Sequence, residues 1–219
     1  MTHTTQPFQQ TWWEKNLENQ MGEFRLWIGD YKAESKVFCR KYIASKGYKS
    51  ILDCGCGVCT EYYGYKNDGY PIEYKGVDAT PKLVALGLKN GIDVVEGYLE
   101  ALPAADASVD VCYIRHILEH LPYYGDAINE AMRVAAKEVV ICWFIKPDDQ
   151  PDLVNYDATN NLYHNRYNID GVLNLIQAHP RFESCETQDI NAQESLFKIK
   201  LKPSLDRPTG AALGRSGSL

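Results

Sequence analysis

The sequence predicts an α/β fold, namely a doubly wound, Rossmann-like and mostly parallel sheet of about seven strands. Short apolar strand patterns alternate with helical patterns along most of the chain, and this alternation is typical of parallel strands joined by right-handed crossovers. The last two strand patterns follow one another without a helix between them, which predicts an antiparallel C-terminal hairpin. The chain has 219 residues, and α/β folds of this length often form a single domain.

The N-terminal part of the chain is predicted to be helical. Large apolar side chains recur every three to four residues between Thr11 and Lys46, and Gly29 and Asp30 interrupt the pattern. We therefore expect a flexible start at residues 1–10, followed by N-terminal helices over residues 11–48.

The sheet is predicted from apolar segments that are bounded by turn residues. Five segments are expected to form the parallel strands, at residues 50–54, 74–78, 92–96, 109–114 and 138–145. Helices are expected at residues 81–89, 126–136 and 168–178, and the hairpin strands at 182–187 and 195–201. Thr80 is a suitable N-cap for the first helix, which begins with Pro81. A single domain over residues 11–202, with its core at 49–202, would then leave residues 203–219 as a flexible tail rich in Pro, Gly and Ser.

Composition excludes several classes of protein. Apolar residues make up 45% and charged residues 24% of the chain, which is the balance of a globular protein rather than a collagen, a coiled coil or a disordered chain. The net charge of −6, without a run of Lys and Arg, disfavours a nucleic-acid partner. No apolar stretch approaches the ~18 residues of a membrane span, and the first twenty residues lack the apolar core of a secretory signal.

The seven cysteines indicate free thiols rather than a disulfide framework. Their number is odd, and Cys112 and Cys142 lie inside apolar runs, where a thiol behaves as a small apolar group. We therefore expect a reducing compartment and a cytoplasmic protein. The cluster of Cys54, Cys56 and Cys59 could also be interpreted as metal ligands, but no second ligand pair at suitable spacing is evident, so no metal is expected.

A glycine turn and an acid together predict a ligand site. The strand that ends at Asp53 runs into Gly55 and Gly57, and Asp78 ends the next strand, 21 residues after Gly57. Glycines allow a sharp turn close to a ligand, and an acid at the tip of the second strand suits a ribose diol. The alternative is a tight turn and a helix cap without a ligand. Because the third glycine of a dinucleotide motif and any phosphate loop are missing, we expect a nucleoside ligand without a diphosphate.

Three successive segments resemble motifs of class I S-adenosylmethionine-dependent methyltransferases, most closely the small-molecule branch called type 11. They are ILDCGCGVC, YKGVDATPKLV and GYLEALPAADASVDVCYIRHILEHL. The resemblance covers about residues 50–145 strongly and 11–202 in outline. It implies S-adenosyl-L-methionine as the cofactor and S-adenosyl-L-homocysteine as its product.

The resemblance also implies cofactor contacts. Asp53 would face the methionine amino group, and Asp78 would hold the ribose hydroxyls. Tyr98 stands where the family usually has an acid that contacts the adenine amino group, so Tyr98 or Leu99 is expected to pack on the adenine instead. The full set of implied cofactor residues is Asp53, Gly55, Cys56, Gly57, Asp78, Ala79, Tyr98, Leu99, Arg115 and His116.

His116 and His120 are the candidate catalytic residues. Methyl transfer from a sulfonium is an in-line displacement that depends largely on positioning, and a hydroxyl acceptor usually also needs a base, for which His is the side chain with a pKa nearest to neutral. If residues 115–120 form a helix, the two histidines share a face. We expect His116 nearer the cofactor and His120 to handle the proton. His120 could instead pack the end of the segment, and a metal site with Glu119 is disfavoured because Glu119 would point elsewhere on a helix.

The segment from Asn161 to Asn168 is expected to bind the acceptor. His164, Arg166 and Tyr167 suit a hydroxyl-rich ligand, and the segment follows the fifth strand at the edge of the sheet where substrate should lie. Asn168 is also a natural N-cap for the next helix. The N-terminal aromatic residues would form a lid over the cofactor or, more simply, pack into the core; they are Trp12, Trp13, Trp27 and Tyr31.

The expected function is O-methylation of a small hydroxylated acceptor such as a sugar or glycan. Two alternatives stay open at this point. A non-catalytic cofactor-binding or scaffold member of the fold is kept open by Tyr98 at the position of the usual acid. An NAD(P)-dependent oxidoreductase is the other, although the missing third glycine speaks against it. The sequence does not indicate an oligomeric state.

Overall fold

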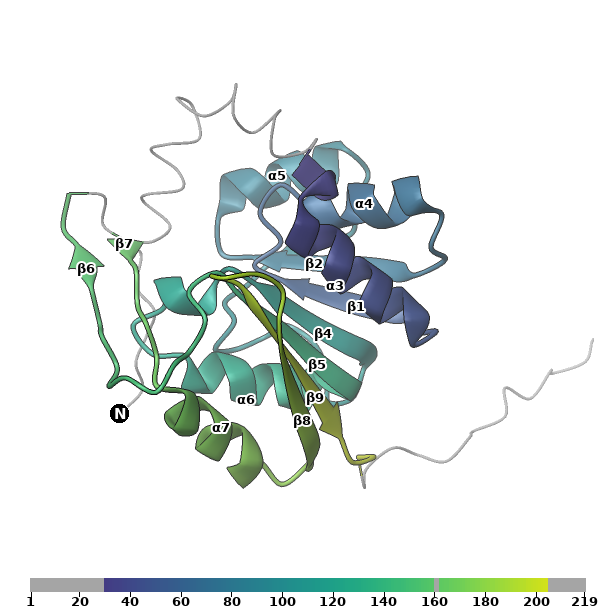
Figure 1. The fold of residues 1–219 in the computed structure, drawn as a ribbon. Coiled ribbons are helices and arrows are strands. Elements are labelled where there is room, and N and C mark those ends of the chain that lie inside the picture. Colours follow the sequence, from purple (N-terminus) through teal and green to yellow (C-terminus); the bar gives the residue numbers. More distant parts are fainter. Residues whose placement is uncertain (1–29, 160–161, 205–219) are drawn as a thin grey trace, which may run out of the picture.

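The computed structural model describes residues 30–159 and 162–204, and their fold is the predicted doubly wound α/β architecture (Figure 1). The expected N-terminal segment up to residue 29, with Trp12, Trp13 and Trp27, and most of the expected tail lie outside the described residues. Seven strands form one sheet in the order β3-β2-β1-β4-β5-β9-β8. They are β1 (Ser50–Cys54), β2 (Glu73–Asp78), β3 (Val94–Glu96), β4 (Val109–Arg115), β5 (Ala135–Trp143), β8 (Phe182–Asp189) and β9 (Ser195–Leu201).

The sheet is mostly parallel and ends in the expected hairpin. β1 pairs in parallel with β2 and β4, and the parallel arrangement continues to β3 on one side and β5 on the other. β9 runs antiparallel to both β5 and β8. Since the chain moves outward from β1 in one direction and then returns to β4 on the other side of β1, the sheet reverses its order there. Ligands of open α/β sheets bind at the carboxyl ends of the strands beside such a reversal.

Helices cover both faces of the sheet (Figure 1). One face carries α3 (Glu34–Ser45), α4 (Thr60–Asp68) and α5 (Pro81–Lys89), and the other carries α6 (Gly125–Val134) and α7 (Ile169–Ala178). Each face has its own apolar cluster; Ile43, Ile51 and Tyr65 belong to the first, and Leu52, Ile128 and Trp143 to the second. The neighbouring positions Ile51 and Leu52 therefore supply opposite cores, as alternation along a strand buried on both faces requires.

Several details differ from the sequence prediction. The helix α4 was not expected, because its sequence TEYYGYKND carries no apolar stripe. Thr80 does precede α5, but its side chain makes no capping hydrogen bond. Asn168 is an N-cap, because its side chain accepts a hydrogen bond from the backbone N–H of Gly171 at 3.0 Å. A small second sheet, of β6 (Tyr156–Asp157) and β7 (Leu162–Tyr163), was also not expected.

The joint between α6 and β5 has no loop. The helix ends at Val134 and the strand begins at Ala135, so the last helical carbonyls need partners from elsewhere. Arg181, which immediately precedes β8, supplies them. Its guanidinium donates to the carbonyls of Met132 and Ala135, both at 2.8 Å, and to that of Ala136 at 3.1 Å.

None of the helices within the described ranges combines the length and the apolar character that crossing a membrane would require.

Candidate functional site

The glycine turn lies over the ends of β1 and β2. The backbone N–H groups of Gly55 and Cys56 donate to the carbonyl of Val77 at 2.8 and 3.0 Å, which holds the turn against β2. Gly55 (φ +78°) and Gly57 (φ +55°) have left-handed backbones, which glycine adopts without a steric penalty. A Cβ on Gly55 would lie 2.7 Å from the side chain of Ile117, whereas one on Gly57 would meet no atom within 4 Å. The open space therefore lies at Gly57.

Asp78 is directly attached to this turn. One carboxylate oxygen accepts from the backbone N–H of Gly57 at 2.8 Å, and the other accepts from the N–H of Thr80 at 2.9 Å. The residue is 8% exposed, and burial raises the pKa of its carboxyl group. The Thr80 hydroxyl also interacts with this carboxylate, and a carboxylate has about four lone-pair sites, so at least one acceptor site is left for a hydroxyl donor. This acceptor, beside the open space at Gly57, fits a ribose hydroxyl of a nucleoside.

Asp53 is buried and paired with a tyrosine. Its carboxylate accepts a hydrogen bond from the hydroxyl of Tyr74 at 2.6 Å, and the residue is 4% exposed. Burial raises the pKa of Asp53 to about 7, partly offset by the bond to Tyr74. A cation placed against this carboxyl group would favour its ionised form, so the site suits an ammonium group.

The segment after β3 comes close to Asp78. The N–H of Gly97 donates to the carbonyl of Asp78 at 3.1 Å. The next residue, Tyr98, is 38% exposed, whereas Leu99 is 6% exposed and its side chain belongs to the core. Tyr98 is therefore the side chain that can cover a ligand beside Asp78, and Leu99 can contribute through its backbone. Ala79, half-buried, follows Asp78 directly.

A group of buried charges lies under the turn, and sequence reasoning found only one member, Arg115. Arg40, on α3, is 1% exposed and donates to Glu61 at 3.2 Å and to Asp68 at 3.0 Å. Arg115 Nε lies 3.8 Å from Glu61 Oε1. Lys36 is 4% exposed; burial, followed by the nearby Arg115, lowers its pKa.

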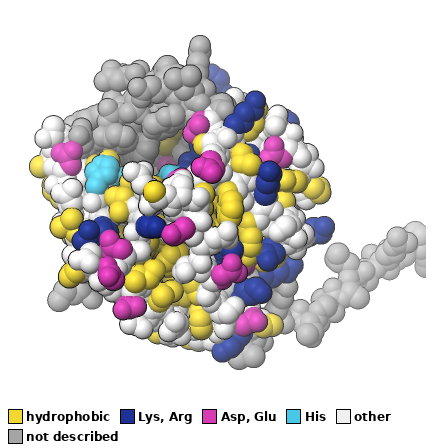
Figure 2. All heavy atoms as spheres, viewed as in Figure 1, with side chains coloured by type: hydrophobic (Ala, Val, Ile, Leu, Met, Phe, Trp, Pro, Cys, Tyr) yellow, Lys and Arg dark blue, Asp and Glu magenta, His cyan; other side chains and the backbone are white. Residues whose placement is uncertain are grey.

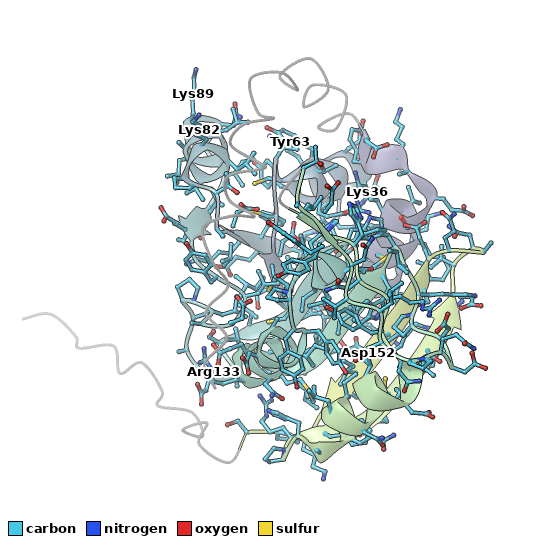
Figure 3. All side chains as sticks on the ribbon, turned by 90° about the vertical axis from the view of Figure 1, so that its left-hand side faces the viewer. Lys36, Tyr63, Lys82, Lys89, Arg133 and Asp152 are labelled. Atoms are coloured by element: carbon cyan, nitrogen blue, oxygen red, sulfur yellow. The ribbon has the colours of Figure 1, made fainter. Side chains whose placement is uncertain are left out.

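Figure 3 shows that Lys82 and Lys89 project from α5 toward solvent, whereas Lys36 lies within the molecule. Lys36 donates to Asp30 at 2.8 Å, so, like Arg40, it has a carboxylate partner within the chain. The sequence pattern does not reveal this burial. Lys36 and Arg40 occur in a helical segment, where charged residues normally lie on the solvent-exposed face of an amphipathic helix.

His116 has hydrogen-bond partners at both ring nitrogens. Nε2 lies 2.7 Å from a carboxylate oxygen of Glu194, which can only accept, so Nε2 carries the hydrogen. Nδ1 lies 2.7 Å from Arg115 Nη1, which can only donate. Burial, with Arg115 as the second cause, lowers the pKa of His116 to about 2. A neutral ring with both nitrogens occupied cannot accept a proton from a substrate, so the structure does not support His116 as a base.

His120 has a different environment. Its Nδ1 lies 2.7 Å from the backbone carbonyl oxygen of Tyr163, and because a carbonyl only accepts, Nδ1 carries the hydrogen and Nε2 keeps its lone pair. Burial lowers the pKa of His120, so the ring is neutral at neutral pH. Its ring centre lies 5.1 Å from that of Phe144 and 5.2 Å from that of His164.

The expected helix through both histidines does not form. His116 has a left-handed backbone (φ +56°), and only the short 3-10 turn η2 (Leu118–His120) follows it. Glu119 holds this turn, because its carboxylate accepts from the N–H groups of Phe144 at 2.6 Å and Ile145 at 3.2 Å. Both histidine rings nevertheless contact one side chain, Phe144, with ring centres 5.4 Å (His116) and 5.1 Å (His120) from its own.

The expected acceptor residues divide between surface and core. His164 is exposed and lies beside His120. Arg166 is half-buried, with Nε 3.6 Å from a carboxylate oxygen of Asp148. Tyr167 is 2% exposed, and its hydroxyl donates to the carbonyl of Leu121 at 2.8 Å. In this structure the Tyr167 hydroxyl is therefore bound within the core and does not face the space beside His120 and His164 as a surface residue would.

One set of side chains among the described residues has metal-ligand chemistry. The ligand atoms of His116, Cys142 and Glu194 lie within 4.8 Å of one another. The hydrogen bond between His116 and Glu194 already accounts for this arrangement, and the guanidinium of Arg115 beside the same ring opposes a further cation. The alternative set with Glu119 does not form, because Glu119 binds backbone N–H groups.

Comparison with known proteins agrees with this geometry. A family model described as a methyltransferase domain matches residues 52–142. A solved structure from Pyrococcus horikoshii is similar over 82% of this chain and 92% of its own, with a TM-score of 0.60 and 16% identity. The 1,6-didemethyltoxoflavin-N1-methyltransferase of Burkholderia thailandensis, solved with its substrate and S-adenosylhomocysteine, is similar over 90% and 88%, with a TM-score of 0.65 and 13% identity.

A third solved structure, phosphoethanolamine N-methyltransferase 2 of Haemonchus contortus with S-adenosyl-L-methionine, is similar over 71% of this chain and 49% of its own, with a TM-score of 0.56 and 11% identity. Sequence comparison with curated proteins finds no match. These structures show the shared fold, and the family match covers the segments that hold the glycine turn, Asp78 and His120. Residues 52–142 match the methyltransferase-domain family model, and the described part of the chain shares the fold of these solved structures.

Proposed function

We propose that the protein transfers the methyl group of S-adenosyl-L-methionine to an oxygen atom of a small hydroxylated acceptor, with a saccharide as the favoured class. The hydrogen bond from His120 Nδ1 to the Tyr163 carbonyl carries this proposal. It leaves the Nε2 of a neutral ring as an acceptor without a hydrogen-bond partner among residues 30–159 and 162–204, which is what a general base for a hydroxyl group needs. A nitrogen acceptor with its own lone pair has less need of such a base.

The residues around the glycine turn support the assignment of the cofactor. Asp78 would accept the ribose hydroxyls, Asp53 would face the methionine amino group, and the cations near Arg115 would offset the methionine carboxylate. Tyr98 would cover the adenine. When bound, the cofactor supplies an electrophilic methyl group on a sulfonium.

The chain's own residues would then position the acceptor and remove its proton. His120 Nε2 would take the proton of the acceptor hydroxyl, so that the acceptor oxygen becomes nucleophilic toward the methyl group that the cofactor would supply. Phe144 and His164 hold the base in place from two sides. The exposed His164, together with Arg166, would contact the acceptor hydroxyls. Most of the rate enhancement would come from holding the two reactants in line.

Two further parts of the proposal concern the partners and the compartment. All seven cysteines are free, which suits a reducing compartment such as the cytosol. We also expect no nucleic-acid partner. On the face shown in Figure 2, acidic and basic side chains are interspersed rather than gathered by sign.

A test compares His120→Gln with His164→Ala in a saccharide panel assayed by S-adenosylhomocysteine release. His120→Gln should lower kcat by ~10²-fold or more and abolish the acidic limb of the pH–rate profile, while S-adenosylhomocysteine affinity is unchanged. His164→Ala should raise KM for the acceptor and keep an acidic limb in the pH–rate profile, because His120 is still present. Wild-type turnover in His120→Gln would contradict the base assignment. Absence of S-adenosylhomocysteine binding by the wild type would favour a non-catalytic member of the fold.

A further inference from the structure

The glycine turn contains two cysteines whose sulfurs are in contact. Cys56 and Cys59 are separated by two residues, and their Sγ atoms lie 3.7 Å apart. The backbone N–H of Cys59 donates to the carbonyl of Cys56 at 2.8 Å, which closes a tight turn between them. The ends of such a turn lie within about 7 Å of each other, close to the Cα separation that a disulfide spans.

Both thiols point into a seam between β2 and α5. A Cβ on Gly76 of β2 would lie 2.7 Å from the sulfur of Cys56, and a Cβ on Gly87 of α5 would lie 3.4 Å from the sulfur of Cys59. Cys56 is 8% exposed and Cys59 is fully buried. A disulfide needs its two sulfurs about 2.05 Å apart, so the turn must bring the Cys56 and Cys59 sulfurs closer together than they are in the reduced protein. The narrow seam leaves little room for this movement. Cys56 is the more exposed of the two residues, and we therefore expect an oxidant to reach it first.

The turn between the two cysteines also holds Asp78. Gly57 lies directly after Cys56, and its N–H donates to the Asp78 carboxylate. Drawing the two sulfurs together changes the backbone of the turn and therefore the position of this N–H group. Other neighbouring thiols lack this connection. Cys54 and Cys112 lie on adjacent strands; Cys54 pairs with Val77 and directly precedes the turn, but the side chains of Cys54 and Cys112 belong to the apolar cluster on the other face of the sheet.

We propose that Cys56 and Cys59 form an oxidisable dithiol site, and that their disulfide weakens cofactor binding at Asp78. The inference rests on the cofactor site proposed above. The oxidant is a peroxide. The Cys56 thiolate attacks a peroxide oxygen and forms a sulfenic acid with loss of one water; the Cys59 sulfur then displaces the sulfenic oxygen as a second water. Two thiols are oxidised by two electrons, and one hydrogen peroxide is reduced to two waters.

The reduced pair is the resting state, and it reacts slowly. Contact with the Cys59 thiol, followed by burial, raises the pKa of Cys56 well above its usual value. The thiolate is the reactive form, so oxidation is faster in alkaline solution. A ligand seated at Gly57 and Asp78 shields the turn and slows the reaction further.

Thermodynamic linkage makes the proposal quantitative. If the disulfide weakens cofactor affinity by a given factor, the cofactor must disfavour the disulfide by the same factor. For this two-electron couple, a tenfold factor corresponds to about 30 mV in midpoint potential. We expect at least a tenfold loss of affinity, and so a midpoint potential at least about 30 mV more positive at saturating S-adenosylhomocysteine.

The experiment uses the full chain in three steps. Hydrogen peroxide is applied at pH 8.5, free thiols are blocked, and peptide mass spectrometry identifies the disulfide. Calorimetry then measures S-adenosylhomocysteine binding to the reduced and oxidised protein. Finally, the midpoint potential is determined in dithiothreitol redox buffers with and without S-adenosylhomocysteine. Cys56→Ser and Cys59→Ser should bind S-adenosylhomocysteine equally before and after peroxide, and Cys185→Ser, on β8, should behave as the wild type.

The wild-type comparison decides the outcome even if a serine variant folds poorly. A Cys56–Cys59 disulfide, weaker binding and a matching shift of potential would support the proposal. Equal affinity of the two states, or a disulfide between other cysteines, would overturn it while leaving the proposed function intact. If the reduced protein itself does not bind S-adenosylhomocysteine, the proposed function fails and the coupling fails with it.

Discussion

Replacing Asp78 separates its contribution to cofactor binding from its contribution to the turn. In Asp78→Asn, the amide oxygen can still accept from one of the two backbone N–H groups, but the amide nitrogen faces the other. The buried N–H of Gly57 or Thr80 that is left without an acceptor should cost about 1–3 kcal/mol of the free energy of unfolding. Loss of charge-assisted bonds to a ribose diol should cost a further 1.5–3 kcal/mol of binding, on the order of 10- to 100-fold in Kd.

Two assays measure these quantities independently. Urea unfolding without ligand gives the stability term, and calorimetry with S-adenosylhomocysteine at a temperature where both proteins are folded gives the binding term. Asp93→Asn is the matched control, because Asp93 is an exposed acid that precedes β3 at the opposite end of the strands. An Asp78→Asn protein with lowered stability but wild-type Kd would refute the assignment of Asp78 to the ribose.

Three other changes test separate parts of the structure. Gly55→Ala should lower the free energy of unfolding by about 1–3 kcal/mol in urea, because φ is +78° and the new Cβ would lie 2.7 Å from Ile117; unchanged stability would show that the turn relaxes freely. Tyr167→Phe should cost about 1–3 kcal/mol, since the Leu121 carbonyl and Asn165 lose a partner, and a changed acceptor KM would contradict its placement in the core. Asp53 has a folded pKa of about 7, above its unfolded value of about 3.9. The contribution of protonated Asp53 to the free energy of unfolding is therefore complete below pH 4 and is lost as the pH rises through 7. The difference in free energy of unfolding between Asp53→Asn and the wild type should accordingly shift in favour of the variant from pH 4 to pH 8, by about 4 kcal/mol at most. Urea unfolding at both pH values measures this, and equal pH dependence of the two proteins would exclude Asp53 as the titrating group.

The sheet could be predicted because its strands are apolar runs with clear ends. The exact bounds of β1 and α5 follow from the turn residues that flank them. The helix α4 could not be predicted from a hydrophobic stripe, because part of its buried face is charged. Glu61 is 4% exposed and pairs with Arg40, which lies 21 residues earlier in the chain. Because a charged residue is normally assigned to the surface, a buried ion pair of this kind leads the sequence pattern to predict exposure at a buried position.

The candidate site could be predicted only in part, because some of its contacts are local in the sequence and others join distant segments. Asp78 and the glycine turn are local features, and their spacing is sufficient to predict contact. The protonation of the two histidines depends on partners far along the chain. His120 meets the Tyr163 carbonyl 43 residues away, and His116 meets Glu194 in the turn between β8 and β9. Arg115 is the one partner that lies close in the sequence, and its position next to His116 does not by itself predict that its guanidinium contacts the ring.

The junction between α6 and β5 depends on a residue from a later part of the chain, because the guanidinium of Arg181 binds its backbone carbonyls. Arg181 follows α7, so a nascent chain that stops before it lacks the guanidinium that donates to four backbone carbonyls at the end of the helix and the start of the strand. Central strand β5 can be extended early, but its junction is completed only when the last hairpin docks. The junction before the central strand β5 is therefore completed only after Arg181, which precedes the edge strand β8, has been synthesised.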